Sequence, residues 1–119
     1  MNTREIGTRK EEAACRYLEQ QGIRIKERNF CCKLGEIDIV GYDGEYLVFF
    51  EVKYRKTGSG KGDAAEAVGI GKQKKICRCS DYYRMIHHLA ADTPIRYDVI
   101  AIDGEQMQWI KNAFDYLER

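Results

Sequence analysis

Three charged side chains, Asp38, Glu51 and Lys53, fall within a segment that otherwise reads as two β-strands joined by a tight turn. The segment, residues 35–55, is GEIDIVGYDGEYLVFFEVKYR. Its Asp43-Gly44 pair is among the strongest short signals for a two-residue hairpin turn. Because side chains alternate between the two faces of a strand, all three charges are predicted to share one face of this hairpin.

The register of this hairpin determines how close the acids come. A turn at Asp43-Gly44 pairs Tyr42 with Glu45 and makes Asp38 a diagonal neighbour of Glu51, roughly 7 to 8 Å away at the backbone. Glu36 then faces Glu51 directly. The predicted charged face carries Glu36, Asp38, Glu51, Lys53 and Arg55, and the opposite, apolar face carries Ile37, Ile39, Val48, Phe50 and Val52.

Acids gathered this closely repel one another and destabilise a hairpin unless a cation compensates them. Carboxylate oxygens suit Mg²⁺ or Mn²⁺, which keep several waters and leave positions open for a phosphate. On the same face, the ammonium of Lys53 could hold or deprotonate a water and stabilise charge on a phosphoryl oxygen. The alternative is a simple surface ion pair of Lys53 with Glu51 or Glu36.

Length and composition favour one domain spanning residues 1–119. The chain is 44% hydrophobic and 33% charged, which is ordinary for a globular protein. It has no apolar run long enough to span a bilayer and no secretory signal at its start, so a cytoplasmic location and no membrane partner are expected.

The cysteines are expected to be free thiols. Their number, five, is odd, and a reducing compartment is the default without an export signal. Cys31-Cys32 and Cys77-x-Cys79 lack the CxxC spacing of a zinc site, which is therefore not favoured. Cys15 lies in a helical pattern and is expected to be a small buried residue.

Basic residues concentrate between positions 53 and 78, although the formal net charge is only +1. This middle segment could face the phosphates of a nucleic acid. The alternative is that its lysines are ordinary solvated surface residues.

The N-terminal half of the chain is predicted to form a helix and three strands. Apolar spacing predicts a helix over residues 4–21, or one that begins at Thr8 with a capping box from Thr8 to Glu11. Strands are expected at about 23–30, 36–42 and 45–55. Residues 31–35 would form the turn after the first strand.

The C-terminal half begins with a glycine-rich loop at 56–62 and a helical pattern at 63–68. A longer helix at about 72–88 is expected to bury Ile76, Cys79, Tyr83 and Ile86 or nearby positions. A strand at 95–102 and a turn at Asp103-Gly104 lead to a strand at 106–110. Alternation predicts that Arg96 and Asp98 form a buried or interface ion pair. The order is αβββαββ, a mixed α/β domain.

Several short motifs, taken in order, resemble the PD-(D/E)XK nuclease superfamily and, within it, the YraN-like family related to Holliday-junction resolvases. They are Gly7-x-x-Lys10-Glu11-x-x-Ala14, Arg28-Asn29-Phe30, Gly35-Glu36-Ile37-Asp38, Phe50-Glu51-Val52-Lys53-x-Arg55, Lys72-Gln73 and Arg96-Tyr97-Asp98-Val99. Each motif is weak alone, but their joint occurrence covers nearly the whole chain.

The resemblance implies a restriction-endonuclease-like fold, with a central mixed sheet flanked by helices, and a Mg²⁺- or Mn²⁺-dependent endonuclease that cuts DNA, including branched DNA. It implies that Asp38 and Glu51 bind the metal, that Lys53 is the catalytic lysine, and that Glu11 and Gln73 are further site residues. Glu36 is a candidate accessory acid, and members often form homodimers. For Glu11, a plain helix-capping role is an equally weighted alternative.

The basic residues nearest the predicted site are the candidates for contacts with DNA: Arg55, Lys56, Lys72 and Lys75. The competing hypothesis is a catalytically silent module that keeps the nuclease fold and binds nucleic acid or assembles with partners. The modest net charge favours this alternative slightly, because non-specific DNA enzymes often carry a stronger basic excess.

Overall fold

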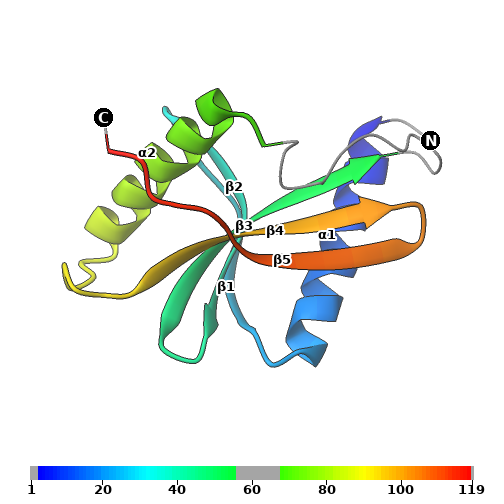
Figure 1. Ribbon diagram of the computed structural model, residues 1–119, viewed down its shortest axis with the longest axis horizontal. Coiled ribbons are helices and arrows are strands. Elements are labelled where there is room, and N and C mark those ends of the chain that lie inside the picture. Colours follow the sequence, from blue (N-terminus) through cyan, green and yellow to red (C-terminus); the bar gives the residue numbers. More distant parts are fainter. Residues whose placement is uncertain (1–2, 56–67, 119) are drawn as a thin grey trace.

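A computed structural model describes residues 3–55 and 68–118 of the chain. The described part has the predicted order αβββαββ and an α/β fold (Figure 1). Its elements are α1 (Thr3–Gln20), β1 (Arg24–Cys32), β2 (Gly35–Asp43), β3 (Tyr46–Arg55), α2 (Ile70–Ile86), β4 (Ile95–Asp103) and β5 (Gln106–Phe114).

The five strands form one mixed sheet in the order β1-β2-β3-β4-β5. Only β3 and β4 are parallel, and every other neighbouring pair is antiparallel. Parallel neighbours need a crossover connection, and α2 lies within the one that joins β3 to β4. The central mixed sheet is therefore confirmed, with β3 as its middle strand.

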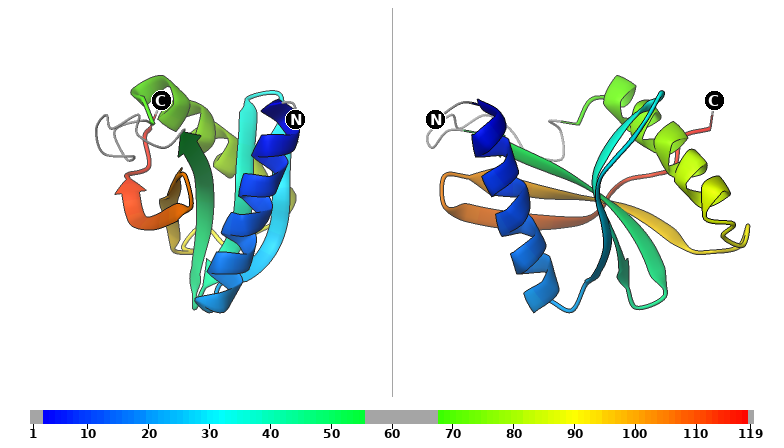
Figure 2. Two further views of the ribbon diagram at one scale, coloured as in Figure 1. Left: turned by 90° about the vertical axis from the view of Figure 1, so that its right-hand side faces the viewer. Right: turned by 180° about the vertical axis from the view of Figure 1, so that it is seen from behind.

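The two helices cover opposite faces of the sheet (Figure 2). On one face, α2 packs over Leu47 and Phe49, and on the other face α1 packs over Val48 and Phe50. The prediction of one apolar and one charged face is therefore wrong, because Leu47 and Phe49 lie on the predicted charged face and are 0% and 1% exposed. The crossover helix buries the face that the hairpin alone would leave wet.

The two hairpins predicted from Asp-Gly pairs turn one residue later than expected. Asp43 pairs with Tyr46, so the two-residue loop is Gly44-Glu45 rather than Asp43-Gly44, and the predicted pairing of Tyr42 with Glu45 is wrong. Gly44 has a φ of 59°, a left-handed conformation that glycine adopts without strain. The resulting two-residue shift in pairing leaves each side chain on its predicted face of β3.

The β1–β2 hairpin bends sharply at Asp38. Ile39 packs in the cluster under α1, whereas Ile37, two residues earlier, packs in the cluster under α2. The prediction that Ile37 and Ile39 share a face is therefore wrong. Asn29, opposite the bend on β1, has a φ of 52°, which asparagine tolerates better than most residues. Figure 2 shows the paired strands curving toward α2.

The boundaries of both helices differ in part from those predicted. Because α1 runs without a break from Thr3, a start at Thr8 with a capping box is wrong. The predicted second helix begins earlier than expected, at Ile70, so Gly71 lies inside it. The predicted burial of Ile76, Cys79 and Tyr83 is confirmed, but Ile86 is 40% exposed. The predicted loop at 56–62 and most of the helical pattern at 63–68 lie outside the described residues.

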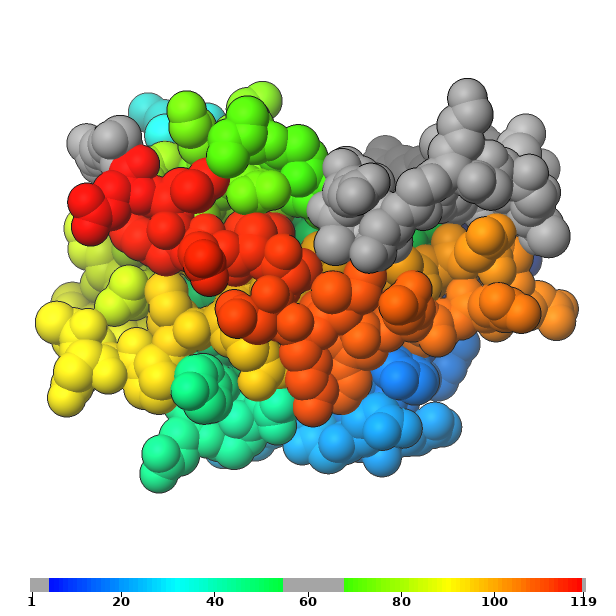
Figure 3. All heavy atoms as spheres, in the orientation of Figure 1, coloured from blue at the N-terminus to red at the C-terminus, as the bar shows by residue number. Residues whose placement is uncertain are grey.

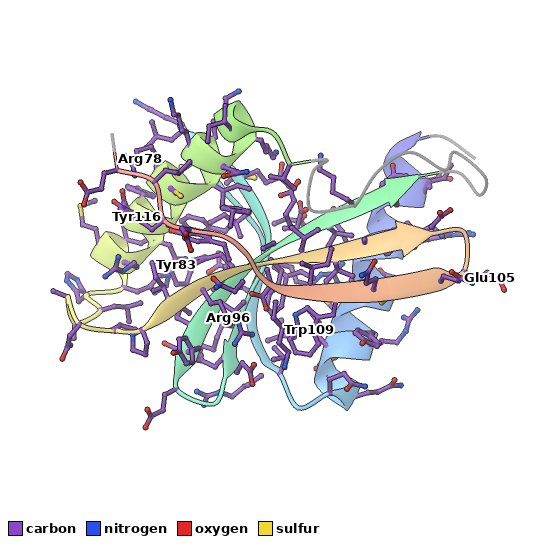
Figure 4. All side chains as sticks on the ribbon, in the orientation of Figure 1. Arg78, Tyr83, Arg96, Glu105, Trp109 and Tyr116 are labelled. Carbon is purple, nitrogen blue, oxygen red and sulfur yellow. The ribbon has the colours of Figure 1, made fainter. Side chains whose placement is uncertain are left out.

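The predicted Arg96–Asp98 ion pair is confirmed and is buried between β4 and β5. Asp98 is 0% exposed and accepts two hydrogen bonds from the Arg96 guanidinium, at 2.9 and 2.8 Å. Trp109 Nε1 and the Asn112 backbone N–H also donate to it, at 2.8 and 2.9 Å. Arg96 and Trp109 are labelled in Figure 4. The network ties the edge strand β5 to the middle of the sheet.

The residues after β5 lie along α2 (Figure 3). Arg78 donates a hydrogen bond to the carbonyl of Leu117, and the Tyr116 hydroxyl donates to Asp81 at 3.1 Å. Cys15 is 7% exposed in the cluster under α1, as predicted. Within the described ranges, neither helix is both long and apolar enough to cross a membrane.

Candidate functional site

Asp38 and Glu51 meet where β2 and β3 separate. Ile39 and Phe50 form the last pair between these strands, so Asp38 comes beside Glu51 rather than diagonal to it. Asp38 Oδ2 accepts a hydrogen bond of 2.8 Å from the backbone N–H of Val52, and its carboxyl group also shares a hydrogen bond with that of Glu51. The two acids that the hairpin predicts to converge therefore do so, in direct contact.

Burial makes this pair hold a proton. Glu51 is only 6% exposed, and loss of solvent followed by the charge of Asp38 raises its pKa to about 7. Burial likewise raises the pKa of Asp38, although the hydrogen bond from Val52 opposes this change. When both carboxyl groups lose their proton, their two negative charges are poorly compensated, because little solvent reaches them.

Two lysines lie beside the acids. The Lys72 ammonium, from α2, is 3.8 Å from Glu51 Oε1, and its charge lowers the pKa of both acids. Lys53, half-buried on β3, lowers the pKa of Glu51 more weakly. Among the described residues, the ion pair with Glu51 is made by Lys72, and not by Lys53 as the alternative interpretation of Lys53 supposed. A predicted DNA-binding lysine thus touches the acid pair.

Glu11 joins the acids from α1. Burial raises its pKa, as do the charges of Asp38 and Glu36, whereas Arg28 and a hydrogen bond from the Asn29 side chain lower it. Because α1 begins at Thr3, Glu11 lies in the middle of the helix and the capping role is wrong. We call Glu11, Glu36, Asp38 and Glu51 the acid cluster.

The remaining candidate residues are placed less centrally. The Gln73 side-chain amide donates to the carbonyl of Val68 at 2.8 Å, near the start of α2. Lys75 is exposed on α2, beside Gly35 at the start of β2. The side chain of Arg55 and the whole of Lys56 lie outside the described residues.

No role was predicted for Arg28 and Asn29, although both are in one of the quoted motifs. The structure places them against Glu11, one as a cation and the other as a hydrogen-bond donor. Both residues are exposed on β1, so strand alternation gave no signal for them, and their place in the quoted motif was the available one.

The carboxylates of Asp38 and Glu51 suit a hard divalent cation that takes few ligands from the protein. Residues 3–55 and 68–118 contain no group of three or more His, Cys, Asp or Glu side chains arranged to hold a metal ion. Mg²⁺, however, usually binds one or two carboxylates and keeps waters for the rest. Asp38 and Glu51 supply two carboxylates, and a cation would displace the proton they share.

The shared proton predicts how stability depends on pH. The pKa of Glu51 rises from 4.5 to about 7 on folding, so the folded metal-free protein binds a proton that the unfolded chain has released. Its stability therefore falls as pH rises from about 4.5 through 7, by at most about 3 kcal/mol. Thermal melts across this range should show the fall, and Glu51→Gln should flatten it. An identical fall in Glu51→Gln would contradict this assignment.

A mixed sheet flanked by helices, with acids on the neighbouring strands β2 and β3 and lysines on β3 and α2, defines an α/β domain with a candidate acid site. The model of Uncharacterised protein family UPF0102 matches residues 10–102, a range that contains Glu11, Asp38, Glu51 and Lys53. The chain belongs to the UPF0102 family.

Relatives of nearly the same length support this membership. A UPF0102 protein of Lachnoclostridium phytofermentans is 47% identical over 115 residues, covering 97% of each chain. A UPF0102 protein of Pseudomonas syringae pv. syringae is 42% identical over 120 residues, covering 96% of this chain and 97% of the relative. One of Legionella pneumophila (strain Corby) is 38% identical over 115 residues, covering 95% and 97%.

Proposed function

We propose that this protein is a metal-dependent endonuclease of the PD-(D/E)XK type that hydrolyses phosphodiester bonds in branched or otherwise structured DNA. The observation that carries the proposal is the contact of the half-buried Asp38 with the buried Glu51, with the ammonium of Lys72 3.8 Å from Glu51 and Lys53 two residues further along β3. The order of the Gly35-Glu36-Ile37-Asp38 and Glu51-Val52-Lys53 motifs, which resembles that superfamily, supports it further.

A structural role explains the acid pair poorly. Burying two carboxyl groups against each other raises the pKa of both, and the proton they share stabilises the pair only below about pH 7. Lysines on both sides are also unnecessary for a pair that stays protonated. Perturbed acids beside cations are typical of active sites, where a bound ion or a substrate restores the balance of charge.

Each residue has a role that follows from its position. Asp38 and Glu51 would hold Mg²⁺ or Mn²⁺, and the Val52 N–H fixes the orientation of Asp38. When bound, the ion would acidify a water and offset the charge of the phosphodiester. The ammonium of Lys53 would stabilise negative charge that develops on the phosphate. Glu11 supplies a further carboxylate on the α1 side, and Gln73 lies at the α2 side.

The same surroundings suit a nucleic-acid backbone. Lys72 pairs with Glu51 when no ion is present, and it would be free to contact a phosphate once a divalent ion neutralises that acid. Lys75 is exposed on the same helix, and Arg55 and Lys56 follow the site residues in sequence. A homodimer, which the family resemblance implies, would present two such sites to a branched substrate.

The test is a panel of linear, flapped and four-way DNA, incubated with Mg²⁺, with Mn²⁺ or with EDTA. We expect cleavage of the branched substrates in either metal and none in EDTA. Salt-dependent binding of DNA without cleavage in any divalent metal would select the catalytically silent binding module instead. A protein that neither binds nor cleaves any of these substrates would refute the proposal.

A further inference from the structure

Two cysteines far apart in sequence meet where the end of β1 packs against α2. Cys32 is the last residue of β1, and Cys79 lies on the buried side of α2. Their Sγ atoms are 3.3 Å apart, and both residues are free thiols. A disulfide bond needs sulfurs about 2 Å apart, so an approach of about 1 Å would join them.

The two thiols have opposite environments. Burial raises the pKa of Cys32, but its hydrogen bonds with the Cys79 thiol and with the Leu34 and Gly35 backbone N–H groups outweigh it, so that the pKa is lowered. The Leu34 nitrogen is 3.3 Å from the Cys32 sulfur. Cys79 is 0% exposed, and its burial, with the contact to Cys32, raises its pKa to about 12. Cys32 is thus the reactive thiol, and Cys79 is a protonated thiol held against it.

We propose that Cys32 and Cys79 form a redox-active dithiol that hydrogen peroxide converts reversibly to a disulfide. In the first step the Cys32 thiolate attacks peroxide, an S–O bond forms, the O–O bond breaks, and the released hydroxide takes a proton to become water. In the second step the Cys79 sulfur attacks the Cys32 sulfur, the S–S bond forms, and the hydroxyl group leaves with the Cys79 proton as a second water. The two thiols are oxidised and the peroxide is reduced.

The other cysteines are placed differently. Cys31 is exposed and lies toward the carbonyl of Asn29 at 3.5 Å. Cys77 is buried, and its sulfur accepts a hydrogen bond from the Leu117 backbone N–H at 3.4 Å. Cys15 packs under the opposite helix, α1.

The cross-link would join two elements that carry the candidate site. Cys32 ends β1 just before the turn into β2, which carries Asp38, and Cys79 follows Lys72 by two turns of α2. A bond between them would fix the end of the β1–β2 hairpin to α2. It would also constrain the unfolded chain, so the oxidised protein should melt at least about 5 °C higher than the reduced one.

The experiment counts thiols and maps the cross-link, and it needs no DNA. Reduced protein is treated with hydrogen peroxide, unfolded, alkylated with N-ethylmaleimide and weighed by mass spectrometry. Cys31→Ser is the matched control, because it removes the adjacent exposed thiol and leaves the pair intact. Trypsin separates Cys77 from Cys79 at Arg78, and because Cys31 and Cys32 stay on one tryptic peptide, the Cys31→Ser variant shows which of these two forms the cross-link.

We expect peroxide to reduce the alkylated thiols from five to three in the wild type, and from four to two in Cys31→Ser. The linked peptides should be residues 29–33 and 79–84, and dithiothreitol should release them. Cys32→Ser and Cys79→Ser should form no cross-link. Five alkylated thiols after peroxide, or a cross-link that maps to another pair, would overturn the proposal whether or not the protein cuts DNA.

Discussion

Replacing Lys53 with alanine is expected to lower the rate of Mg²⁺-dependent DNA cleavage by about 10²- to 10⁴-fold. The Lys53 ammonium lies close enough to Glu51 to lower its pKa, so it is placed to act on charge that forms at an ion held there. The fold should survive the change, because the ion pair with Glu51 is made by Lys72. Single-turnover cleavage of the best branched substrate measures the effect directly.

A change elsewhere on the basic surface provides the control for lost charge. Lys74→Ala removes one positive charge from an exposed position on α2. It should weaken DNA binding slightly and reduce the salt dependence, with little effect on single-turnover cleavage at saturating protein. Equal losses of cleavage in Lys53→Ala and Lys74→Ala would mean that Lys53 contributes charge alone, which would contradict its catalytic role.

Replacing Asp98 with alanine is expected to destabilise the protein by about 3 to 5 kcal/mol. The carboxylate is fully buried, and its removal leaves the indole N–H of Trp109 and the backbone N–H of Asn112 without their acceptor. It also leaves the Arg96 guanidinium, which is 14% exposed, with Asp43 as its remaining acidic partner among the described residues. Urea denaturation of the two proteins gives the difference in the free energy of unfolding.

Asp43 is the matched acid, because it binds the same guanidinium from a more exposed position. Its Oδ2 lies 2.9 Å from the Arg96 Nη2, and its side chain is 35% exposed. Solvent screens such a pair, so Asp43→Ala should cost about 1 kcal/mol or less. If the two alanine variants lost equal stability, the buried network around Asp98 would not be what holds β5 to the sheet.

Local signals in the sequence predicted the elements but not their exact pairing. Helical periodicity and the two Asp-Gly pairs located α1 and both hairpins, since these signals act over a few residues. The predicted strand pairing was wrong by two residues. The first position of the loop has a left-handed conformation, which favours Gly44 over Asp43, so Asp43 stays in β2 and pairs with Tyr46. The burial of Leu47 and Phe49 was missed because it depends on a helix that returns from far along the chain.

The same distinction holds for the candidate site. The convergence of Asp38 and Glu51 was predictable, because alternation and one turn relate them. The approach of Lys72 and the contact between Cys32 and Cys79 were not, since both depend on how α2 packs on the sheet. The bend at Asp38 could not be predicted either. The residue opposite it with an unusual backbone conformation is Asn29, and one asparagine within a strand is a weak signal.

Binding of Mn²⁺ to the protein without DNA tests the central claim most directly. Electron paramagnetic resonance of free Mn²⁺ at about pH 8, where the proton shared by the acids is largely lost, gives the number of bound ions and their affinity. We predict a saturable site in the wild type that is lost or weakened at least about tenfold in Asp38→Asn and Glu51→Gln. Undiminished Mn²⁺ binding in both variants would contradict the assignment of these two acids as a metal site.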